Sequence, residues 1–456
     1  MFAAAGLLAL VMVDYLRPQE YFAFLASVPL LHIATALAIL GFVLDLRLGL
    51  SRLQAAPHLA LTMQFAVWCL VTVAFKAREQ FPVRAQALLI PIAIYVIVAH
   101  GIQTFRMLQV ACTFLLAIAV ALAGLGVQQG MADHGCHRMV VRSGHLQYVH
   151  DGRPCSREER NACEGEGAEP GADYACEKVG LLGTQTDHGR VRYRGTLQDP
   201  NELALAIGVA LPFAFALLDR RRSIPRIALA AVATAAIGAC IYFTQSRGGL
   251  LVFAAVLGVY FVRRYGMLRG LAVGAALALP LLLWGGRSGA VAVASTMERL
   301  ECWWVGLHLA ASSPVFGVGY GQFTDHHILT AHSSFVLAAA ELGLPGMLLW
   351  SAIAYVSVKI PVQALRAQLT PVARTWATAL LASTTGLLVG SMFLSYAYKD
   401  VFWVYVGLTG ALYGAIRRHD PSFAVRFGLR DLVVVSFVDL ALLVFLVGYT
   451  GLKLGW

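Results

Sequence analysis

Residues 107–126, MLQVACTFLLAIAVALAGLG, form a run of twenty residues without a charged side chain. A helix of about twenty apolar residues, rising about 1.5 Å per residue, crosses the hydrocarbon core of a bilayer. A membrane-spanning strand would alternate apolar and polar residues, and this run does not. We therefore expect a transmembrane helix here.

The rest of the chain has the same character. Of its 456 residues, 59% are hydrophobic and 13% are charged, whereas soluble domains have about 45–50% apolar and about 25% charged residues. This composition excludes a soluble globular protein and a disordered chain. We find thirteen apolar runs: 2–16, 27–45, 58–75, 86–100, 107–126, 202–219, 227–243, 249–262, 270–285, 333–358, 375–396, 401–416 and 432–450. The sequence predicts an all-α fold, a polytopic transmembrane helical bundle of about 12–13 spans.

The net charge of +10 is informative through its placement, because basic residues gather in cytoplasmic loops. With a cytoplasmic N-terminus, seventeen basic residues lie in inside loops: Arg47, Arg52, Arg106, Arg220, Arg221, Arg222, Arg226, Arg263, Arg264, Arg269, Lys359, Arg366, Arg374, Arg417, Arg418, Arg426 and Arg430. Nine lie in short outside segments: Arg17, Lys76, Arg78, Arg84, Arg247, Arg287, Arg299, Lys399 and Lys453. We expect this orientation.

The same residues exclude two other interpretations. No basic n-region precedes the apolar start MFAAAGLLAL, so we expect the first span to be retained rather than cleaved as a signal peptide. No basic stretch is interleaved with aromatic residues as a single-strand groove requires, so we expect no nucleic-acid partner.

Residues 127–200 form a long loop that we expect on the outer side of the membrane. The loop holds eleven of the 25 acidic residues and four of the eight cysteines, namely Cys136, Cys155, Cys163 and Cys176. An even number of cysteines outside the membrane predicts two disulfides, with three possible pairings. Histidines lie nearby, but no CxxC or HxxxH spacing supports a metal site, so we prefer disulfides. The other four cysteines lie in or near apolar runs and are expected to be packing thiols.

Three polar segments lie at the outer edge of the spans, where each charged group is costly and needs a reason. The first is residues 190–202, RVRYRGTLQDPNE. Asp199 as N-cap, Pro200 at the first helical position and Glu202 three residues after the cap predict a helix start. Arg192 and Arg194, just upstream of this positive helix end, would hold a diphosphate. A capped helix with solvated arginines fits the spacing equally well.

The second segment is residues 244–249, TQSRGG, between two spans. Its glycines permit a tight turn, and Arg247 lies at the membrane edge. Arg247 is either a ligand for an anion or an arginine that snorkels to the interface.

The third segment runs over residues 303–346 and forms a second outer loop. Its glycines, in SPVFGVGYG over residues 313–321, do not form GxGxxG and follow no strand, so a dinucleotide site is excluded. His332 opens an apolar helix, where it is either structural or a group for proton transfer. Glu341 precedes Gly343, Pro345 and Gly346, so it either faces a cavity or bonds backbone groups that this break in the helix frees.

Taken in order, these segments resemble the O-antigen ligase and polymerase family of bacterial inner-membrane glycosyltransferases. The matching residues are Arg194-Gly195, Asp199-Pro200-Asn201, Leu203-Ala204, Ser246-Arg247-Gly248, Pro314, Gly317-Val318-Gly319, His332, Glu341, Gly343, Pro345 and Gly346. The opening DYLRPQ, residues 14–19, resembles a subgroup found with exopolysaccharide and protein-glycosylation gene sets. The family usually has Asn after the histidine, where this chain has Ser333, and the cysteine-containing insert has no counterpart.

The resemblance implies metal-independent transfer of a saccharide from a polyprenyl diphosphate carrier, such as undecaprenyl diphosphate, to an acceptor hydroxyl on the periplasmic side. Lipopolysaccharide or other polysaccharide biosynthesis is the expected process, without a cofactor. Arg194 and Arg247 would neutralise the departing diphosphate, and His332 would take the acceptor proton. The expected substrate-binding residues are Arg192, Asn201, Ser246, Glu341 and Gly319. The expected partners are the lipid-linked donor, a glycan, lipid A core or protein hydroxyl as acceptor, and the bilayer.

Several alternatives stay open. An O-antigen ligase, a repeat-unit polymerase and a protein O-oligosaccharyltransferase share the same donor chemistry. A lipid or solute transporter is a different class, but transporters bury ionisable groups near the midplane, whereas these groups cluster at one face. We divide the chain into N-terminal transmembrane helices (1–126), the cysteine-containing loop (127–200) and C-terminal transmembrane helices (201–456), with the ligase-like core over about 194–346.

Overall fold

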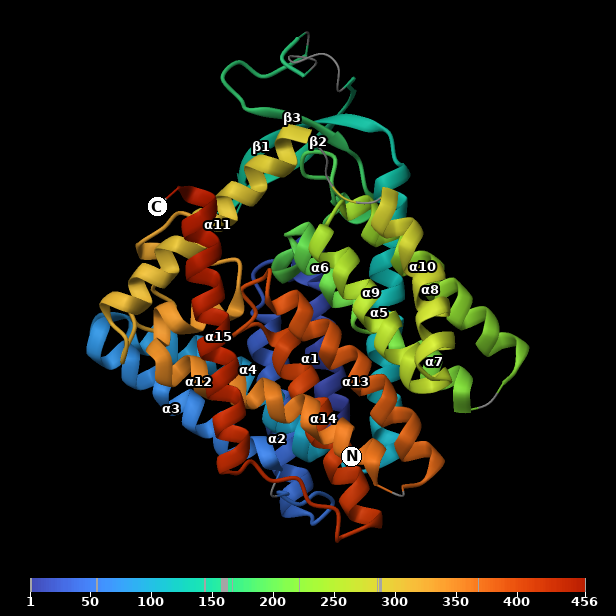
Figure 1. The fold of residues 1–456 in the computed structure, drawn as a ribbon. Coiled ribbons are helices and arrows are strands. Elements are labelled where there is room, and N and C mark those ends of the chain that lie inside the picture. The colour runs from blue at the N-terminus through green and yellow to red at the C-terminus, as the bar shows by residue number, and fades with distance from the viewer. Residues whose placement is uncertain are drawn as a thin grey trace.

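A computed structural model of the protein describes residues 2–54, 56–142, 145–156, 163–165, 167–220, 222–284, 286, 289–367 and 369–455. Arg221 and Arg287, counted above for the orientation, lie outside these residues. The described helices form one bundle, with a small β-sheet beyond one end of it (Figure 1).

The helices of the first half of the chain precede the sheet. They are α1 (Phe2–Leu16), α2 (Leu30–Arg47), α3 (Pro57–Lys76), α4 (Phe81–Gly101) and α5 (Phe105–Met131). Each coincides with one of the first five apolar runs, because a contiguous apolar run specifies a membrane helix locally.

The helices of the second half follow the sheet. They are α6 (Pro200–Gly208), α7 (Pro212–Arg220), α8 (Ile224–Thr244), α9 (Arg247–Tyr265), α10 (Met267–Trp284), α11 (Gly289–Ser312), α12 (Ser334–Arg366), α13 (Pro371–Ser391), α14 (Asp400–His419) and α15 (Leu429–Leu454). The run over 202–219 is divided between α6 and α7, since Pro212 has no N–H and begins a new helix. Helix α11 matches no predicted run, because Glu298, Arg299 and Glu301 interrupt its apolar sequence.

The described chain holds nine helical segments long and apolar enough to cross a membrane, rather than 12–13. They are α2, α3, α4, α5, the pair α6–α7, α8, α9, α12 and α15. Helices α13 and α14 are less apolar because they carry buried polar residues, such as Ser383, Thr384 and Thr409. Almost all of α14 is buried, so it contacts protein rather than lipid. Helix α15 lies on the outside of the bundle and is mostly exposed (Figure 1).

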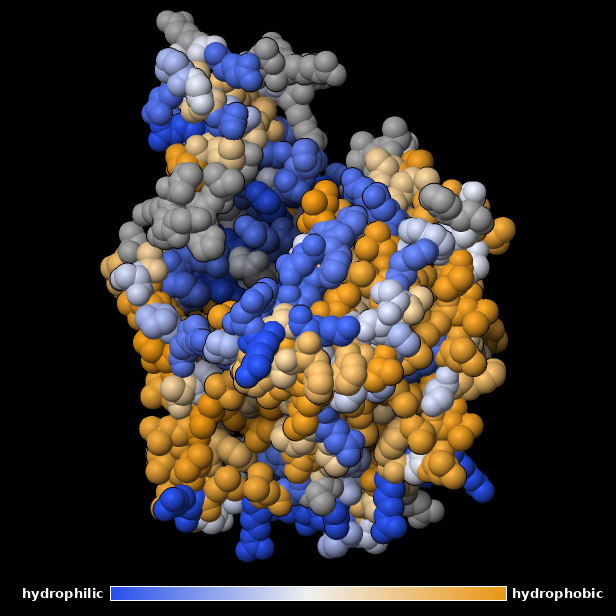
Figure 2. All heavy atoms as spheres, turned by 90° about the vertical axis from the view of Figure 1, so that its left-hand side faces the viewer, coloured by the Kyte–Doolittle hydropathy of each residue, from blue (hydrophilic) through white to orange (hydrophobic). Residues whose placement is uncertain are grey.

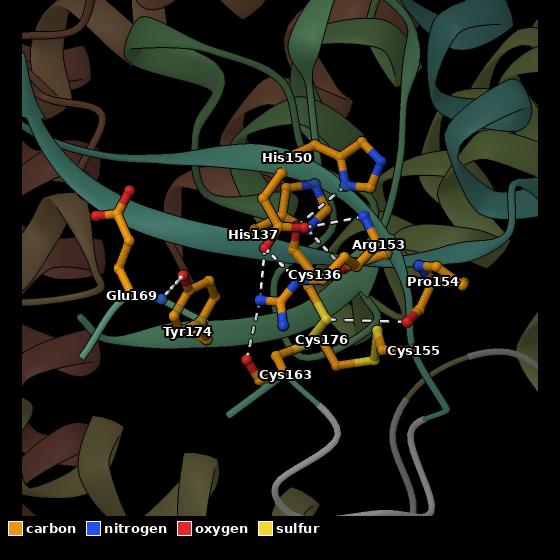
Figure 3. The surroundings of a disulfide bond; sticks show 12 residues. Cys136, His137, His150, Arg153, Pro154, Cys155, Cys163, Glu169, Tyr174 and Cys176 are labelled. Carbon is orange, nitrogen blue, oxygen red and sulfur yellow. Dashed lines mark hydrogen bonds and ion pairs between the residues drawn. A yellow bond between two sulfur atoms is a disulfide. The ribbon is translucent and has the colours of Figure 1, made fainter. Parts of the chain in front are cut away.

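The loop over residues 127–200 folds into a sheet that the sequence analysis did not anticipate. Strands β1 (His134–Arg142), β2 (His145–Pro154) and β3 (Tyr174–Lys178) pair antiparallel in the order β2-β1-β3. We call residues 134–178 the β cap. Cys136 is joined to Cys163, and Cys155 to Cys176 (Figure 3).

The two cystines lie side by side. The sulfur atoms of Cys136, Cys155 and Cys163 are all within 4.8 Å of one another. Cystine sulfurs are not the thiolates that bind zinc, so this grouping has a covalent origin. Arg153 adds a further tie, because its guanidinium donates to the carbonyl oxygen of Cys163 at 3.0 Å and lies over the ring of Tyr174.

The surface divides along the length of the bundle. Figure 2 shows a mostly hydrophobic belt, a hydrophilic hollow beneath the β cap and further hydrophilic residues at the opposite end. The N-terminus lies toward the end away from the β cap, and the C-terminus lies on the β-cap side (Figure 1). The polar segments identified from sequence lie at the end of the bundle beneath the β cap.

Candidate functional site at the β-cap end

Helix α6 begins where the sequence predicts. Asp199 is the N-cap, and its Oδ1 accepts hydrogen bonds from the backbone N–H of Asn201 and from Asn201 Nδ2, each at 2.7 Å. Pro200 is the first helical residue. Glu202 does not complete a capping box, because its carboxylate pairs with Lys399 at 3.2 Å. The start of α6 is thereby tied to the segment before α14.

The first two polar segments contact each other directly. Asn201 Oδ1 accepts from Ser246 Oγ at 2.7 Å and from Arg190 Nη2 at 3.3 Å. Arg190 Nε donates to the carbonyl oxygen of Thr244 at 3.0 Å. Ser246 caps α9 by accepting from the N–H of Gly249 at 2.9 Å. These buried bonds fix the position from which α9, and with it Arg247, starts.

Arg190 was missed by the sequence analysis. It is 8% exposed, whereas Arg192 and Arg194 were selected because they lie nearer the helix start. One sequence signal for Arg190 was available. It is the first of three arginines at alternate positions and is followed by the apolar Val191. Its role depends on Thr244, 54 residues away, which the sequence does not show.

Arg194 is held by three backbone carbonyl oxygens. Its Nη1 donates to Glu20 at 2.7 Å, and its Nη2 donates to Leu182 at 2.8 Å and Gly183 at 2.7 Å. Burial lowers the pKa of the Arg194 guanidinium, and the Glu20 carboxylate partly offsets this. An arginine in a protein nonetheless stays protonated. Because carbonyls carry no net charge, these three bonds place the cation without cancelling it.

Arg192 and Arg194 line a cavity of about 560 Å³ beneath the β cap. Arg192 is less firmly held, since its ion pair with Asp187 spans 3.8 Å. From the cap, His137 and His150 line the same cavity, with ring centroids 5.3 Å apart. Each ring bonds a backbone carbonyl through Nδ1, and its Nε2 has no partner among the described residues. Burial lowers the pKa of His137. The cavity presents two guanidiniums together with the Glu20 carboxylate.

Arg247 lines a separate cavity of about 430 Å³. It is the first residue of α9, and its side chain is exposed. Lys453 of α15 lines the cavity too, while Val293, Met297 and Leu300 of α11 supply apolar walls. Two cations beside an apolar wall suit an anion that carries a lipid tail. Lys453 was counted from sequence only as an orientation charge.

His332 lies close to the start of α6. It has a left-handed backbone conformation, with φ 49°, and immediately precedes Ser333, the N-cap of α12. Burial lowers the pKa of the half-buried His332 imidazole, and Arg299 of α11 lowers it further, whereas Asp199 and Glu298 act in the opposite direction. The charges that act on His332 thus come from Asp199, at the start of α6, and from α11. A strained, non-glycine residue in such a setting is typical of a functional position.

The backbone after His332 is also anchored to its surroundings. Ser334 Oγ donates to the carbonyl oxygen of Leu394 at 2.7 Å and accepts from the N–H of Tyr396 at 2.8 Å. The hydroxyl of Tyr396 in turn donates to the carbonyl oxygen of Glu202 at 3.4 Å. The third polar segment is thus connected to the first through the residues that precede α14.

Glu341 bonds backbone groups rather than facing an open cavity. It is 2% exposed, and its two carboxylate oxygens accept from the N–H groups of Gly321 and Phe323, each at 2.9 Å. Its carbonyl oxygen accepts from Gly319, which has φ 105°. Gly343, at φ 68°, breaks α12. The segment over residues 319–323 packs against this part of the helix. Glu341 and Gly319 therefore hold the loop that leads to His332.

The predicted site residues thus fall into groups. Asn201 and Ser246 are in contact, with Asp199 next to His332; Arg192 and Arg194 line the cavity beneath the cap, and Arg247 lines the cavity against α11. Arg299, which acts on His332, was also used from sequence only to count charge.

The O-antigen ligase family matches residues 229–351. This segment contains Arg247, Gly319, His332 and Glu341, and it excludes the β cap and residues 190–202. Over residues 229–351 the resemblance inferred from short motifs is confirmed, and the motifs at 194–204 lie outside the match. No curated protein matches the chain.

Proposed function

We propose that this chain, whose residues 229–351 match the O-antigen ligase family, transfers a saccharide from a polyprenyl diphosphate to an acceptor hydroxyl at its β-cap end. The observation that carries the proposal is the position of His332. The charges of Asp199 and Arg299 act on His332. Arg299 belongs to α11, and the same helix lines the cavity of Arg247 and Lys453. Helix α11 therefore connects the proposed proton acceptor, His332, with the two cations, Arg247 and Lys453.

The chemistry requires one proton transfer and one bond exchange. The acceptor hydroxyl gives its proton to the neutral His332 imidazole while its oxygen attacks the anomeric carbon of the donor sugar. The bond from that carbon to the diphosphate breaks, and the diphosphate leaves with the bonding electrons. A positioned cation stabilises the negative charge that develops. Because burial and Arg299 lower its pKa, His332 is neutral and able to accept at neutral pH.

Arg247 is our first candidate for the leaving group, with Lys453 beside it. The diphosphate would lie between these cations, and the polyprenyl chain would follow Val293, Met297 and Leu300 toward the bilayer. Arg194, which bonds three carbonyl oxygens and has Glu20 nearby, is the second candidate, and Arg192 lines the same cavity. Asn201 and Ser246 support Arg247 by fixing the start of α9.

The family match favours an O-antigen ligase-like reaction at the periplasmic side of the inner membrane. A polysaccharide polymerase or a protein O-oligosaccharyltransferase uses the same groups and differs in the acceptor. Deletion of the gene followed by glycan analysis separates the three. Loss of capped lipid A core indicates a ligase, loss of chain length a polymerase, and loss of glycoprotein a protein glycosyltransferase.

The catalytic proposal is tested on purified protein with a polyprenyl diphosphate saccharide and an acceptor. Arg247→Ala should lower turnover by about 100- to 1,000-fold, the usual cost of removing one positioned charge. Arg247→Lys should recover only part of it, because an ammonium cannot grip two oxygens in parallel. Arg263→Ala, at the other end of the same helix, is the matched control. Normal turnover by Arg247→Ala, or loss of activity on adding a chelator, would contradict the proposal.

The orientation is tested independently in whole cells. A membrane-impermeant thiol reagent should label a cysteine placed at exposed Asp325, and not one placed at exposed Ser223. The native cysteines give little background, because Cys69, Cys112, Cys240 and Cys302 are buried and the others are paired. Labelling at Ser223 alone would put the site on the cytoplasmic side.

A further inference from the structure

The end of the bundle opposite the β cap contains a cavity that the proposed reaction does not use. It has a volume of about 570 Å³, within the range of small-molecule sites. Ala4, Leu7 and Leu8 of α1 form one wall, and Met107 and Val110 of α5 form another. Leu50 and Val110 are 49% and 51% exposed, so these walls open to the surroundings of the bundle. In a membrane those surroundings are lipid.

Two arginines line the same cavity as these apolar walls. Arg106 of α5 and Arg418 of α14 both line the cavity and are both exposed. Neither guanidinium is hydrogen-bonded or ion-paired to any residue in the described part of the chain. Their neighbours in sequence, Phe105 and His419, stack with ring centroids 5.7 Å apart, which keeps both arginines at the same opening.

The position of Arg106 needs an explanation. A cation in the first turn of a helix lies at the positive end of the helix dipole, where it destabilises the helix. An anion in the opening between it and Arg418 would offset this cost. Among the described residues that line the cavity, none is acidic. The charge of the opening is thus uniformly positive.

A buried polar group points to the same ligand. Ser51 is 5% exposed and lines the cavity, and its hydroxyl, which bonds no described residue, keeps access to the cavity. A hydroxyl on the cavity wall without a protein partner is available to bond a ligand or water. Gln103, which is 7% exposed, also lines the cavity. Its side-chain Nε2 already donates to the carbonyl oxygens of Arg52 and His100.

We propose that this cavity binds an anionic phospholipid, with its phosphate between Arg106 and Arg418 and an acyl chain along Leu7, Leu8 and Val110. Basic pockets between helices at a membrane surface bind anionic headgroups in this way. A free phosphate would use the two arginines but leave the apolar walls empty, so the mixed lining selects the lipid. The site is independent of the proposed transfer reaction.

The test uses native mass spectrometry of the purified full chain, titrated with phosphatidylglycerol and with phosphatidylcholine of identical acyl chains. Phosphatidylglycerol should bind more tightly. Arg106→Gln and Arg418→Gln should each weaken its binding roughly fivefold, and the double variant roughly 25-fold, from the attraction expected per basic residue. Phosphatidylcholine, whose choline offsets the charge of its phosphate, should lose less affinity than phosphatidylglycerol. Arg366→Gln, an exposed arginine outside the cavity, is the matched control and should behave as the parent protein.

Two further arms separate the sources of the anion. Val110→Trp, at a half-exposed wall position, should also weaken phosphatidylglycerol binding because it fills the acyl site. Inorganic phosphate at millimolar concentration should not displace the lipid. Displacement by phosphate, equal binding of both lipids, or unchanged binding by the double arginine variant would each overturn the proposal.

Discussion

Arginines at the two ends of the bundle are held in opposite ways. Beneath the β cap, Arg190 is buried against Thr244 and Asn201, and Arg194 donates to three carbonyl oxygens. At the other end, Arg106 and Arg418 are exposed and bond no described residue. A guanidinium taken out of water must have its donors satisfied, whereas an exposed one keeps its hydration and is available to lipid. The cap end therefore holds fixed charge, and the other end presents adaptable charge.

The largest effect at the cap end is expected from His332. His332→Ala should lower turnover by about 100- to 10,000-fold, the range for loss of a general acid or base, while affinity for the lipid-linked donor stays near normal. Single-turnover rates and donor binding, measured on equal amounts of protein, check this. His326→Ala, an exposed histidine in the same loop, should retain parent activity. Equal behaviour of the two variants would remove His332 from the reaction.

Next in size is the contribution of the cystines to the β cap. Each closes a loop, with sequence separations of 27 and 21 residues, so the chain-entropy model assigns each about 3 kcal/mol. The double variant Cys136→Ser and Cys163→Ser should make the cap sensitive to limited proteolysis while the bundle stays intact. Cys112→Ala, a buried thiol, is the control.

Direct mapping checks the pairing itself. Alkylation without reduction, followed by mass mapping, should find none of Cys136, Cys155, Cys163 and Cys176 free. Four free thiols in protein from intact cells would rule out both cystines.

Comparison of Arg190 with Arg192 sharpens the contrast between fixed and adaptable charge. Arg190→Ala removes charged hydrogen bonds to Thr244 and Asn201 and should cost about 2–3 kcal/mol in the free energy of unfolding. Arg192→Ala should cost less than about 0.5 kcal/mol, since its ion pair is long and lies on the surface. Thermal unfolding in detergent measures both. Equal losses would show that the buried bonds of Arg190 do not stabilise the contact between the segments of Thr244 and Asn201.

The smallest expected effect is on pH dependence. A general base acts when neutral, and a pKa below the usual value keeps His332 neutral to lower pH, so kcat/KM should fall only below about pH 6.5. Removing the nearby positive charge raises the His332 pKa, so Arg299→Gln should move this fall to higher pH. Glu298→Gln should move it to lower pH. Both shifts should be less than about one pH unit, since Glu298 is exposed and Arg299 is half-buried, so that water screens both charges. A shift in the reverse direction would exclude His332 as the base.

Local features of the sequence determined the helices and the start of α6. A contiguous apolar run needs no distant partner to become a helix in lipid, because its backbone bonds are satisfied within the run. The cap at Asp199 and the break at Gly343 are local for the same reason, since they depend on side chains and dihedral angles within a few residues. The family motifs from Arg247 to Glu341 could also be recognised, as the match over residues 229–351 confirms.

Only the tertiary structure decided the rest, because it depends on which distant segments meet. Four cysteines allow three pairings, and the fold joins Cys136 to Cys163 and Cys155 to Cys176, although the sheet register sets Cys136 opposite Cys176. Arg190 rather than Arg192 is buried because Thr244 lies next to it in the fold. Glu341 bonds backbone groups because the fold brings the N–H of Gly321 to its carboxylate. Long-range contacts of this kind leave no periodic trace in the sequence, since each is fixed by the packing of whole helices against one another.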